Sequence, residues 1–268
     1  MKKLLFLFFF IAPLQSWSFT QLISGTGQVA QGWSSSTITF NIDTSCNAYL
    51  NTVNAAIDNA ANIWGHVPSS SLKIVRGSTT VLPGVITNYI GNTANSYPPL
   101  GNPIVYCDSN FQADSGVSAA STPGFATGQY VDSDNKINSC LLVLNVQASA
   151  AANITTLDQT VVNTVLTHEI GHCIGLGHSA DENALMYYAT GAGRKTVLAK
   201  DDMDGVTFMY PINESNMSSI FPGCAAIASD RSLPVTSRGT AMTAILFELC
   251  FLLSVGLGTR RLLSKLMK

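Results

Sequence analysis

The most informative stretch of this sequence is His168-Glu169-Ile170-Gly171-His172-Cys173-Ile174-Gly175-Leu176-Gly177-His178. Its first two histidines are four residues apart, so on a helix both imidazoles would project from the same face. Gly175 follows soon afterwards and readily adopts the left-handed conformation that ends many helices. We therefore expect the helix to stop there and the chain to turn back, which would bring His178 close to His168 and His172.

Three converging imidazoles suit a catalytic zinc ion. Zinc binds nitrogen ligands at about 2.0–2.1 Å in a tetrahedral array, and a catalytic site keeps the fourth position open for water. Glu169 would face that water, whose pKa zinc lowers to roughly 7, and would act as general base before passing the proton to the leaving amine. The stretch therefore predicts one catalytic Zn²⁺ held by His168, His172 and His178, with Glu169 as the catalytic residue.

The pattern H-E-x-x-H-x-x-G-x-x-H is a specific signal because it fixes five positions at set spacing. Of the 4 histidines in the chain, three fall in this pattern. At these residues the chain resembles the metzincins, and among them matrixins of the bacterial type: Ser179 follows the last histidine, and Ala184-Leu185-Met186-Tyr187 looks like the matrixin Met-turn. The resemblance covers about residues 33–211 and is strongest over residues 156–211.

This resemblance implies an α+β fold. The expected metzincin-type catalytic domain has a mixed, mainly parallel twisted sheet, two long helices, a short C-terminal helix and an active-site cleft across the domain. It also implies that Met186 forms a hydrophobic floor under the zinc without binding it. Tyr188 stands where a tyrosine approaches the zinc in astacins and serralysins, but beside a matrixin-like motif we expect a pocket-wall or core residue. Since His66 is the one histidine outside the motif and is expected to end a helix, we expect no second zinc site like that of animal matrixins.

Hydrophobic periodicity predicts the elements that support the motif. We expect strands at 37–42, 72–76 and 138–146, and helices at 49–64, from the capping-box residues Thr156 and Gln159 to Gly175, and from Asp201 to Pro211. Residues 77–128 are rich in Gly, Pro, Ser, Thr and Asn, so we expect long surface loops there. Short strand candidates within them are residues 85–90 and 104–106.

The cysteines of the expected domain leave three disulfide pairings open. These cysteines are Cys46, Cys107, Cys140 and Cys173. Cys173 would point about 100° around the helix from His172. That direction suits a core thiol or a disulfide better than a zinc ligand.

A calcium ion is a second candidate metal. The side chains of a short polar turn offer oxygen ligands of the kind that Ca²⁺ prefers: Asp132, Ser133, Asp134 and Asn135. A solvated hairpin turn is the alternative interpretation, and we favour it.

Both ends of the chain are typical of targeting segments. Residues 1–18 combine two lysines, an apolar run and small residues at Ser16 and Ser18, which predicts a secretory signal peptide. The protease domain is expected at 19–212 and a linker at 213–238. Residues 239–268 are apolar with a basic tail, which favours a membrane segment or a sorting signal over a helix packed on the domain, although Glu248 opposes insertion. We therefore expect an exported protein at the cell surface or in the periplasm, anchored by this helix or released after processing.

Together these features predict an exported zinc-dependent endopeptidase that hydrolyses peptide bonds of a protein or peptide substrate. Charged residues make up 11% of the chain and the net charge is -2, so no basic excess points to nucleic acid. The chain is expected to be a monomer. Two alternatives are a non-catalytic zinc-containing surface or adhesion domain, which loss of Glu169 would have favoured, and an intracellular metal-binding protein, which the predicted signal peptide disfavours.

Overall fold

The computed structural model describes residues 19–24, 27–90, 97–188 and 195–212, all within one compact unit, Met1–Asn213. The predicted signal peptide (1–18), the whole predicted linker (213–238) and the predicted membrane segment (239–268) lie outside the described residues. The prediction of a protein anchored by a C-terminal helix needs correction. In the ranges that the structure describes, no helix is long and apolar enough to cross a membrane.

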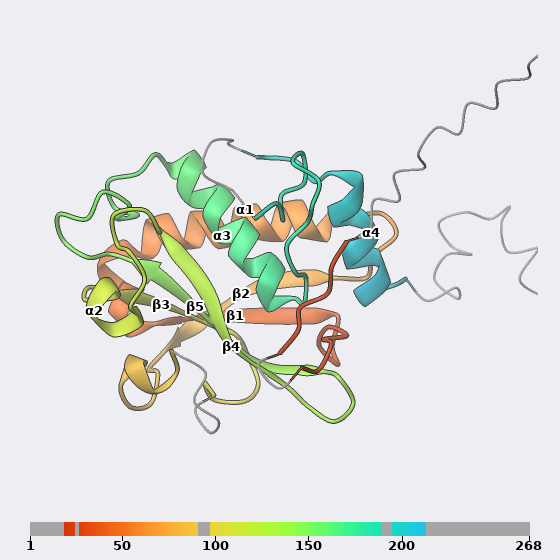
Figure 1. Cartoon of the computed structure of the whole chain (residues 1–268), viewed down its shortest axis with the longest axis horizontal. Coiled ribbons are helices and arrows are strands. Elements are labelled where there is room, and N and C mark those ends of the chain that lie inside the picture. Colours follow the sequence, from red (N-terminus) through yellow and green to blue (C-terminus); the bar gives the residue numbers. More distant parts are fainter. Residues whose placement is uncertain (1–18, 25–26, 91–96, 189–194, 213–268) are drawn as a thin grey trace, which may run out of the picture. The chain divides into compact units, whose positions relative to one another are not determined.

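A five-stranded sheet with the order β2-β1-β3-β5-β4 forms the centre of the domain (Figure 1). Strands β1 (Thr37–Asp43), β2 (Lys73–Thr80), β3 (Ile104–Asp108) and β5 (Ile137–Asn145) pair in parallel. Strand β4 (Gly124–Val131) is antiparallel to β5 and lies at the edge. This mixed, mainly parallel sheet with its helices confirms the predicted α+β class.

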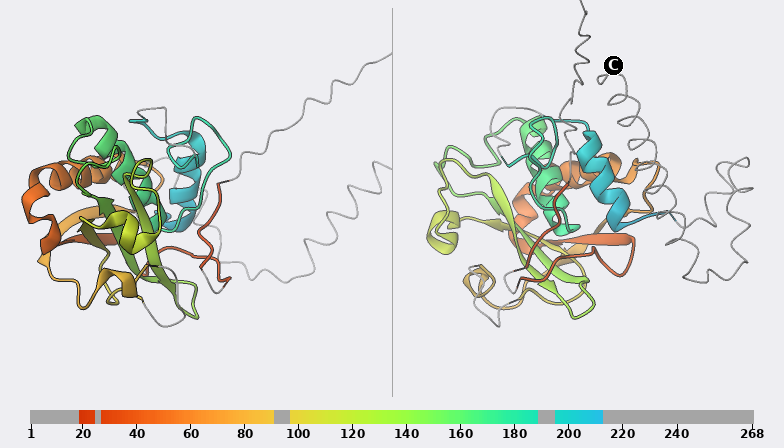
Figure 2. Two further views of the ribbon diagram at one scale, coloured as in Figure 1. Left: turned by 60° about the vertical axis from the view of Figure 1, so that its left-hand side comes forward. Right: turned by 45° about the vertical axis from the view of Figure 1, so that its right-hand side comes forward.

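The helices are α1 (Leu50–Gly65), α2 (Phe111–Ser115), α3 (Gln159–Cys173) and α4 (Lys200–Met209), with 3₁₀ turns η1 (Thr44–Tyr49) and η2 (Ile86–Asn88). The two long helices, α1 and α3, lie side by side over one face of the sheet (Figure 2). The Trp64 indole of α1 donates to the Thr167 carbonyl of α3 at 2.9 Å. This contact between the helices helps to fix the position of α3, which carries most of the motif.

The sequence of β5 explains why the sheet is buried on both sides. Leu142 and Leu144 belong to the core under α1 and α3, whereas Leu141 and Val143 belong to the core on the opposite face with Phe111 of α2. A strand covered on both faces is apolar at every position rather than at alternate ones. The predicted buried strand at 138–146 is therefore confirmed, as are the strand at 37–42 and the helix at 49–64.

Several boundaries differ from the predictions. Residues 85–90 contain the 3₁₀ turn η2 and not a strand, and the expected loop region 77–128 contains α2 and the first part of β4. Strand β4 lacks a regular apolar pattern, and backbone pairing with β5 at the sheet edge holds it, so tertiary context outweighs its weak propensity. The N-cap of α3 is Asp158, which accepts from the Thr160 amide at 2.8 Å, so the predicted capping box at Thr156 is wrong.

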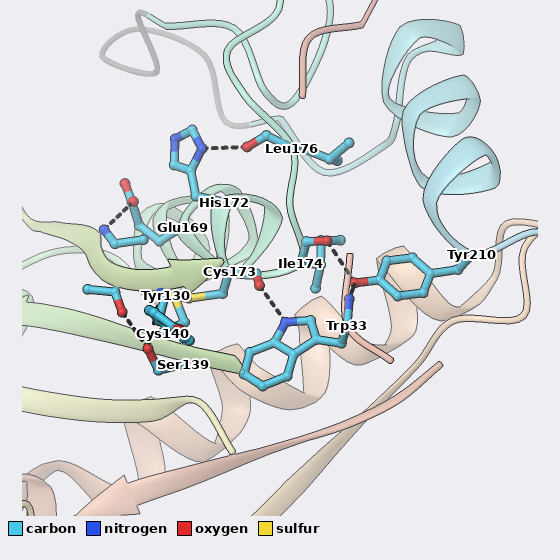
Figure 3. The surroundings of a disulfide bond; sticks show 12 residues. Trp33, Tyr130, Ser139, Cys140, Glu169, His172, Cys173, Ile174, Leu176 and Tyr210 are labelled. Carbon is cyan, nitrogen blue, oxygen red and sulfur yellow. Dashed lines mark hydrogen bonds between the residues drawn. A yellow bond between two sulfur atoms is a disulfide. The ribbon is translucent and has the colours of Figure 1, made fainter. Parts of the chain in front are cut away.

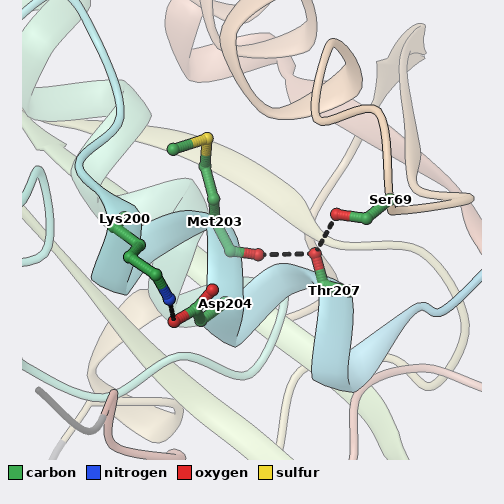
Figure 4. A network of polar contacts seen from close by, with 5 residues as sticks. All are labelled: Ser69, Lys200, Met203, Asp204 and Thr207. Atoms are coloured by element: carbon green, nitrogen blue, oxygen red, sulfur yellow. Dashed lines mark hydrogen bonds and ion pairs between the residues drawn. The ribbon is translucent and has the colours of Figure 1, made fainter. Parts of the chain in front are cut away.

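Helix α4 is fixed at both ends by polar contacts (Figure 4). Lys200 and Asp204 form an exposed ion pair one turn apart. Near the other end, the Thr207 hydroxyl donates to the Met203 carbonyl at 2.6 Å and lies 2.6 Å from the Ser69 hydroxyl. These contacts lie along α4, whose first turn also carries Asp202, the residue that bonds to the amides of Leu185 and Met186.

Candidate active site

The end of α3 has the geometry that the sequence predicts. The helix stops at Cys173, and Gly175 follows with φ 109°. A Cβ at this position would lie 2.8 Å from Met209 Sδ, so both the dihedral and the space require glycine. The turn at Gly175 allows the chain to return toward α3 with His178.

The structure brings His168, His172 and His178 together. One nitrogen from each ring lies within 4.8 Å of the others. The ring centroid of His172 lies 4.8 Å from that of His168 and 4.7 Å from that of His178. The three rings converge on one point from the helix and from the turn, as the spacing of the motif predicts.

Backbone carbonyls orient two of the three rings. Nδ1 of His168 lies 2.8 Å from the Leu185 carbonyl. Nδ1 of His172 lies 2.8 Å from the Leu176 carbonyl, and Figure 3 shows this second contact. With hydrogen on each Nδ1, the Nε2 lone pairs are left for a metal, which is the usual arrangement around histidine ligands.

Burial keeps these histidines neutral. It lowers the pKa of His168 to about 4 and that of His172 to about 3, and it also lowers the pKa of the more exposed His178. A neutral imidazole is the form that binds metal. The site is therefore ready to bind a cation near neutral pH without first releasing protons from its rings.

The Met-turn lies against α3. A Cβ at Gly171, between the two helical histidines, would lie 2.2 Å from Met186 Sδ, so the methionine occupies the space beside α3. Met186 is 2% exposed. Asp202 of α4 accepts from the amides of Leu185 at 2.7 Å and Met186 at 3.0 Å. Asp202 of the last helix thus holds the turn that carries Met186.

Glu169 is held by the edge strand. Its Oε2 accepts a hydrogen bond from the Ala126 amide of β4 at 2.8 Å (Figure 3). Burial raises the pKa of Glu169 to about 8 in the metal-free chain, and a nearby divalent cation would act in the opposite direction. Sequence reasoning did not find Ala126, because its contribution is a backbone amide that leaves no side-chain signal.

Tyr188 and His66, both considered in the sequence analysis, lie in different surroundings. Tyr188 is 65% exposed, so it is not a core residue, and its ring centroid lies 4.4 Å from that of Tyr187. The alternative of a pocket wall stays a prediction. His66 caps the C-terminus of α1, with Nδ1 2.5 Å from the Asn62 carbonyl, as expected.

The Asp132 turn has the contacts of a hairpin turn. Its carboxylate accepts from the amides of Asp134 and Lys136 at 2.9 Å each and from the side-chain amide of Asn138 at 2.6 Å. These bonds, chiefly the one from Lys136, lower the pKa of Asp132. Both carboxylate oxygens already have N–H donors, which favours the hairpin interpretation over a calcium site.

The structure selects one of the three disulfide pairings, with bonds Cys46–Cys107 and Cys140–Cys173. The second bond joins the centre of β5 to the last residue of α3, directly after His172 (Figure 3). Cys173 therefore takes part in a disulfide, one of the two roles that its direction on the helix suggests.

Comparison with known proteins agrees with this geometry. Residues 91–211 match the family model described as Matrixin. Over 187 residues the chain is 27% identical to human Matrilysin, covering 66% of this chain and 58% of that protein. It is 52% identical over 54 residues to Metalloendoproteinase 5-MMP of Arabidopsis thaliana (19% of this chain, 15% of the relative). It is also 49% identical over 53 residues to Metalloendoproteinase 1 of Glycine max (19% and 17%).

A mixed sheet, two long helices, three converging histidines and a buried methionine turn define a domain of the metzincin class. Within that class, the family match and these relatives show that the chain contains a matrixin-like metzincin domain. The chain spans between 15% and 58% of the length of these three relatives.

Proposed function

We propose that this protein is an exported zinc-dependent endopeptidase that hydrolyses peptide bonds in protein or peptide substrates. One observation carries the proposal: three neutral histidines converge on one point, and the adjacent Glu169 is held beside that point by the edge strand. The names of two plant relatives support this, since both proteins are named metalloendoproteinases.

The donor set fits zinc. Imidazole nitrogen is a preferred zinc ligand, and three protein ligands are typical of a catalytic rather than a structural site. The Nδ1 contacts to Leu185 and Leu176 point the remaining nitrogens of His168 and His172 inward. His168, His172 and His178 would hold the ion, with one position open for water or substrate.

When bound, zinc would lower the pKa of a water molecule and polarise the substrate carbonyl. Glu169 would take a proton from the attacking water and deliver it to the amide nitrogen that leaves as an amine. The Ala126 amide keeps one carboxylate oxygen of Glu169 in place, so the other oxygen is free for proton transfer. The base is therefore positioned before substrate arrives.

Export is supported by the disulfides. Bonds such as Cys46–Cys107 and Cys140–Cys173 persist in oxidising compartments and are rare in reducing cytosol. The disulfides lie in the described part of the chain, whereas the predicted signal peptide lies outside it.

The test is hydrolysis of casein by the purified protein, with and without a chelator, followed by addition of zinc. We expect activity that the chelator abolishes and zinc restores, with one zinc per chain by metal analysis. A folded protein that contains no zinc would contradict the proposal. A protein that binds zinc but leaves casein intact would instead support the non-catalytic surface or adhesion domain.

A further inference from the structure

Residues 173–178, which run from the end of α3 to the third histidine, are held mainly by residues outside this segment. The Trp33 indole donates to the Cys173 carbonyl at 2.7 Å, and the Tyr210 hydroxyl donates to the Ile174 carbonyl at 2.7 Å (Figure 3). The Leu176 carbonyl contacts the His172 ring. The turn that carries His178 is therefore shaped by partners that are remote in sequence.

The amino-terminal residues 20–22 make the contacts nearest to His178. The Leu22 amide donates to the Gly175 carbonyl at 2.8 Å, and the Gly177 amide donates to the Thr20 carbonyl at 2.8 Å. Gln21 and Leu176 form an antiparallel bridge. The Thr20 hydroxyl donates to the carbonyl of His178 itself at 2.5 Å. Residues 20–22 thus run beside the ligand-bearing turn as a short added strand.

The approach of the two segments is close. A Cβ at Gly177 would lie 2.6 Å from Thr20 Oγ1 and 2.9 Å from the Gln21 carbonyl oxygen. Any side chain at residue 177 would therefore push residues 20–22 away from the turn. Glycine at this position permits the pairing, just as Gly175 permits the turn.

We propose that residues 20–22 are a positioning element of the metal site, and that Thr20 is the residue in it that fixes His178. Two of the histidines have rigid support of their own, because they lie on α3 and their rings contact backbone carbonyls. His178 lies on the turn and is the most exposed of the three. The His178 carbonyl accepts a hydrogen bond from the Thr20 hydroxyl, so the position of residues 20–22 determines the position of the third histidine.

This proposal rests on zinc binding by the three histidines. The experiment measures the zinc dissociation constant of the full chain by competition with a chelator. Thr20→Val removes the hydroxyl but keeps the shape of the side chain. We expect zinc binding about 2- to 10-fold weaker, the size of one net hydrogen bond. Thr20→Ser restores the hydroxyl and should bind zinc like the wild type.

Thr207→Val is the matched control, because the Thr207 hydroxyl also donates to a backbone carbonyl, but that carbonyl belongs to Met203 of α4 and not to the turn that carries His178 (Figure 4). It should leave zinc affinity within about 2-fold of wild type, since a lost hydrogen bond of this size affects only local stability. Equal affinities for wild type and Thr20→Val would overturn the proposal, as would equal losses in Thr20→Val and Thr207→Val. A wild-type protein that binds no zinc would instead contradict the proposed function.

A double-mutant cycle adds a second measurement. Gly177→Ala should displace residues 20–22 by the steric conflict described above, and zinc binding should weaken. If residues 20–22 act through Thr20, adding Thr20→Val to Gly177→Ala should weaken zinc binding no further, because the effects of substitutions at coupled residues are not additive. Fully additive losses would show that the two residues act independently and would overturn the proposal.

Discussion

The carboxylate of Glu169 on α3 accepts a hydrogen bond of 2.8 Å from the backbone amide of Ala126 on the edge strand β4. This bond joins the proposed catalytic base to a strand that is distant in sequence. It means that a substitution at Glu169 can be designed to keep the contact while removing the base, since an amide oxygen also accepts a hydrogen bond.

Glu169→Gln should keep the fold and bind zinc but lose most activity. The glutamine oxygen can still accept from the Ala126 amide, and the histidines are unchanged. Loss of a general base typically costs on the order of 10²–10⁴ in rate. Casein hydrolysis, zinc content and thermal unfolding should be measured together. A variant as active as the wild type would place the base elsewhere.

Gly175→Ala should weaken zinc binding although Gly175 is not a ligand. The new Cβ would meet Met209 Sδ at 2.8 Å, and φ of 109° strains any residue with a side chain. Gly116→Ala is the control, since Gly116 also has positive φ (72°) but nothing within 4 Å of the added Cβ. The control should cost about 1–2 kcal/mol in unfolding free energy and leave zinc affinity unchanged. Equal zinc affinity in both variants would contradict a special role for the turn.

The two disulfides should differ in their effect on the metal. Replacing both cysteines of either pair by alanine should lower the unfolding free energy by about 2–5 kcal/mol. The Cys46–Cys107 loop is longer, 61 residues against 33, so loop entropy favours the larger loss there. Only loss of Cys140–Cys173 should also weaken zinc binding, because that bond fixes the residue after His172. The measurements are urea unfolding and chelator competition. If both variants lost zinc affinity in proportion to their loss of unfolding free energy, the prediction would be contradicted.

Asp202→Asn should destabilise the Met-turn. Both carboxylate oxygens of Asp202 accept backbone amides, from Leu185, Met186 and Ala199, whereas asparagine has one acceptor oxygen and would present N–H groups to an N–H donor. The loss should be about 1–3 kcal/mol in unfolding free energy.

The control for this change is Asp204→Asn in the same helix, which breaks only the exposed ion pair with Lys200. Exposed pairs of this spacing contribute about 0.3–0.5 kcal/mol. Urea unfolding of both variants gives the comparison. Losses of similar size would mean that Asp202 does not hold the turn in the way its hydrogen bonds indicate.

Local spacing was enough to predict the part of the site that lies in one continuous stretch. The interval between His168 and His172 follows the helical repeat, and Gly175 marks the turn to His178, so their convergence follows from local geometry. The helix at 49–64 and the buried strand at 138–146 were predicted for the same reason, since burial of a helix face or of both faces of a strand leaves a pattern in the sequence.

Only the tertiary structure decided the contacts between distant segments. Strand β4 was not predicted because an edge strand is stabilised by backbone pairing with β5, which does not require an apolar pattern. The pairing of Cys140 with Cys173 depends on the approach of β5 to the end of α3. The amide of Ala126 acts through the backbone, which is the same in every residue type, so its role at Glu169 depends on where folding places it. Thr20 acts through its hydroxyl, but His178 is distant in sequence, so only the tertiary structure brings the two together.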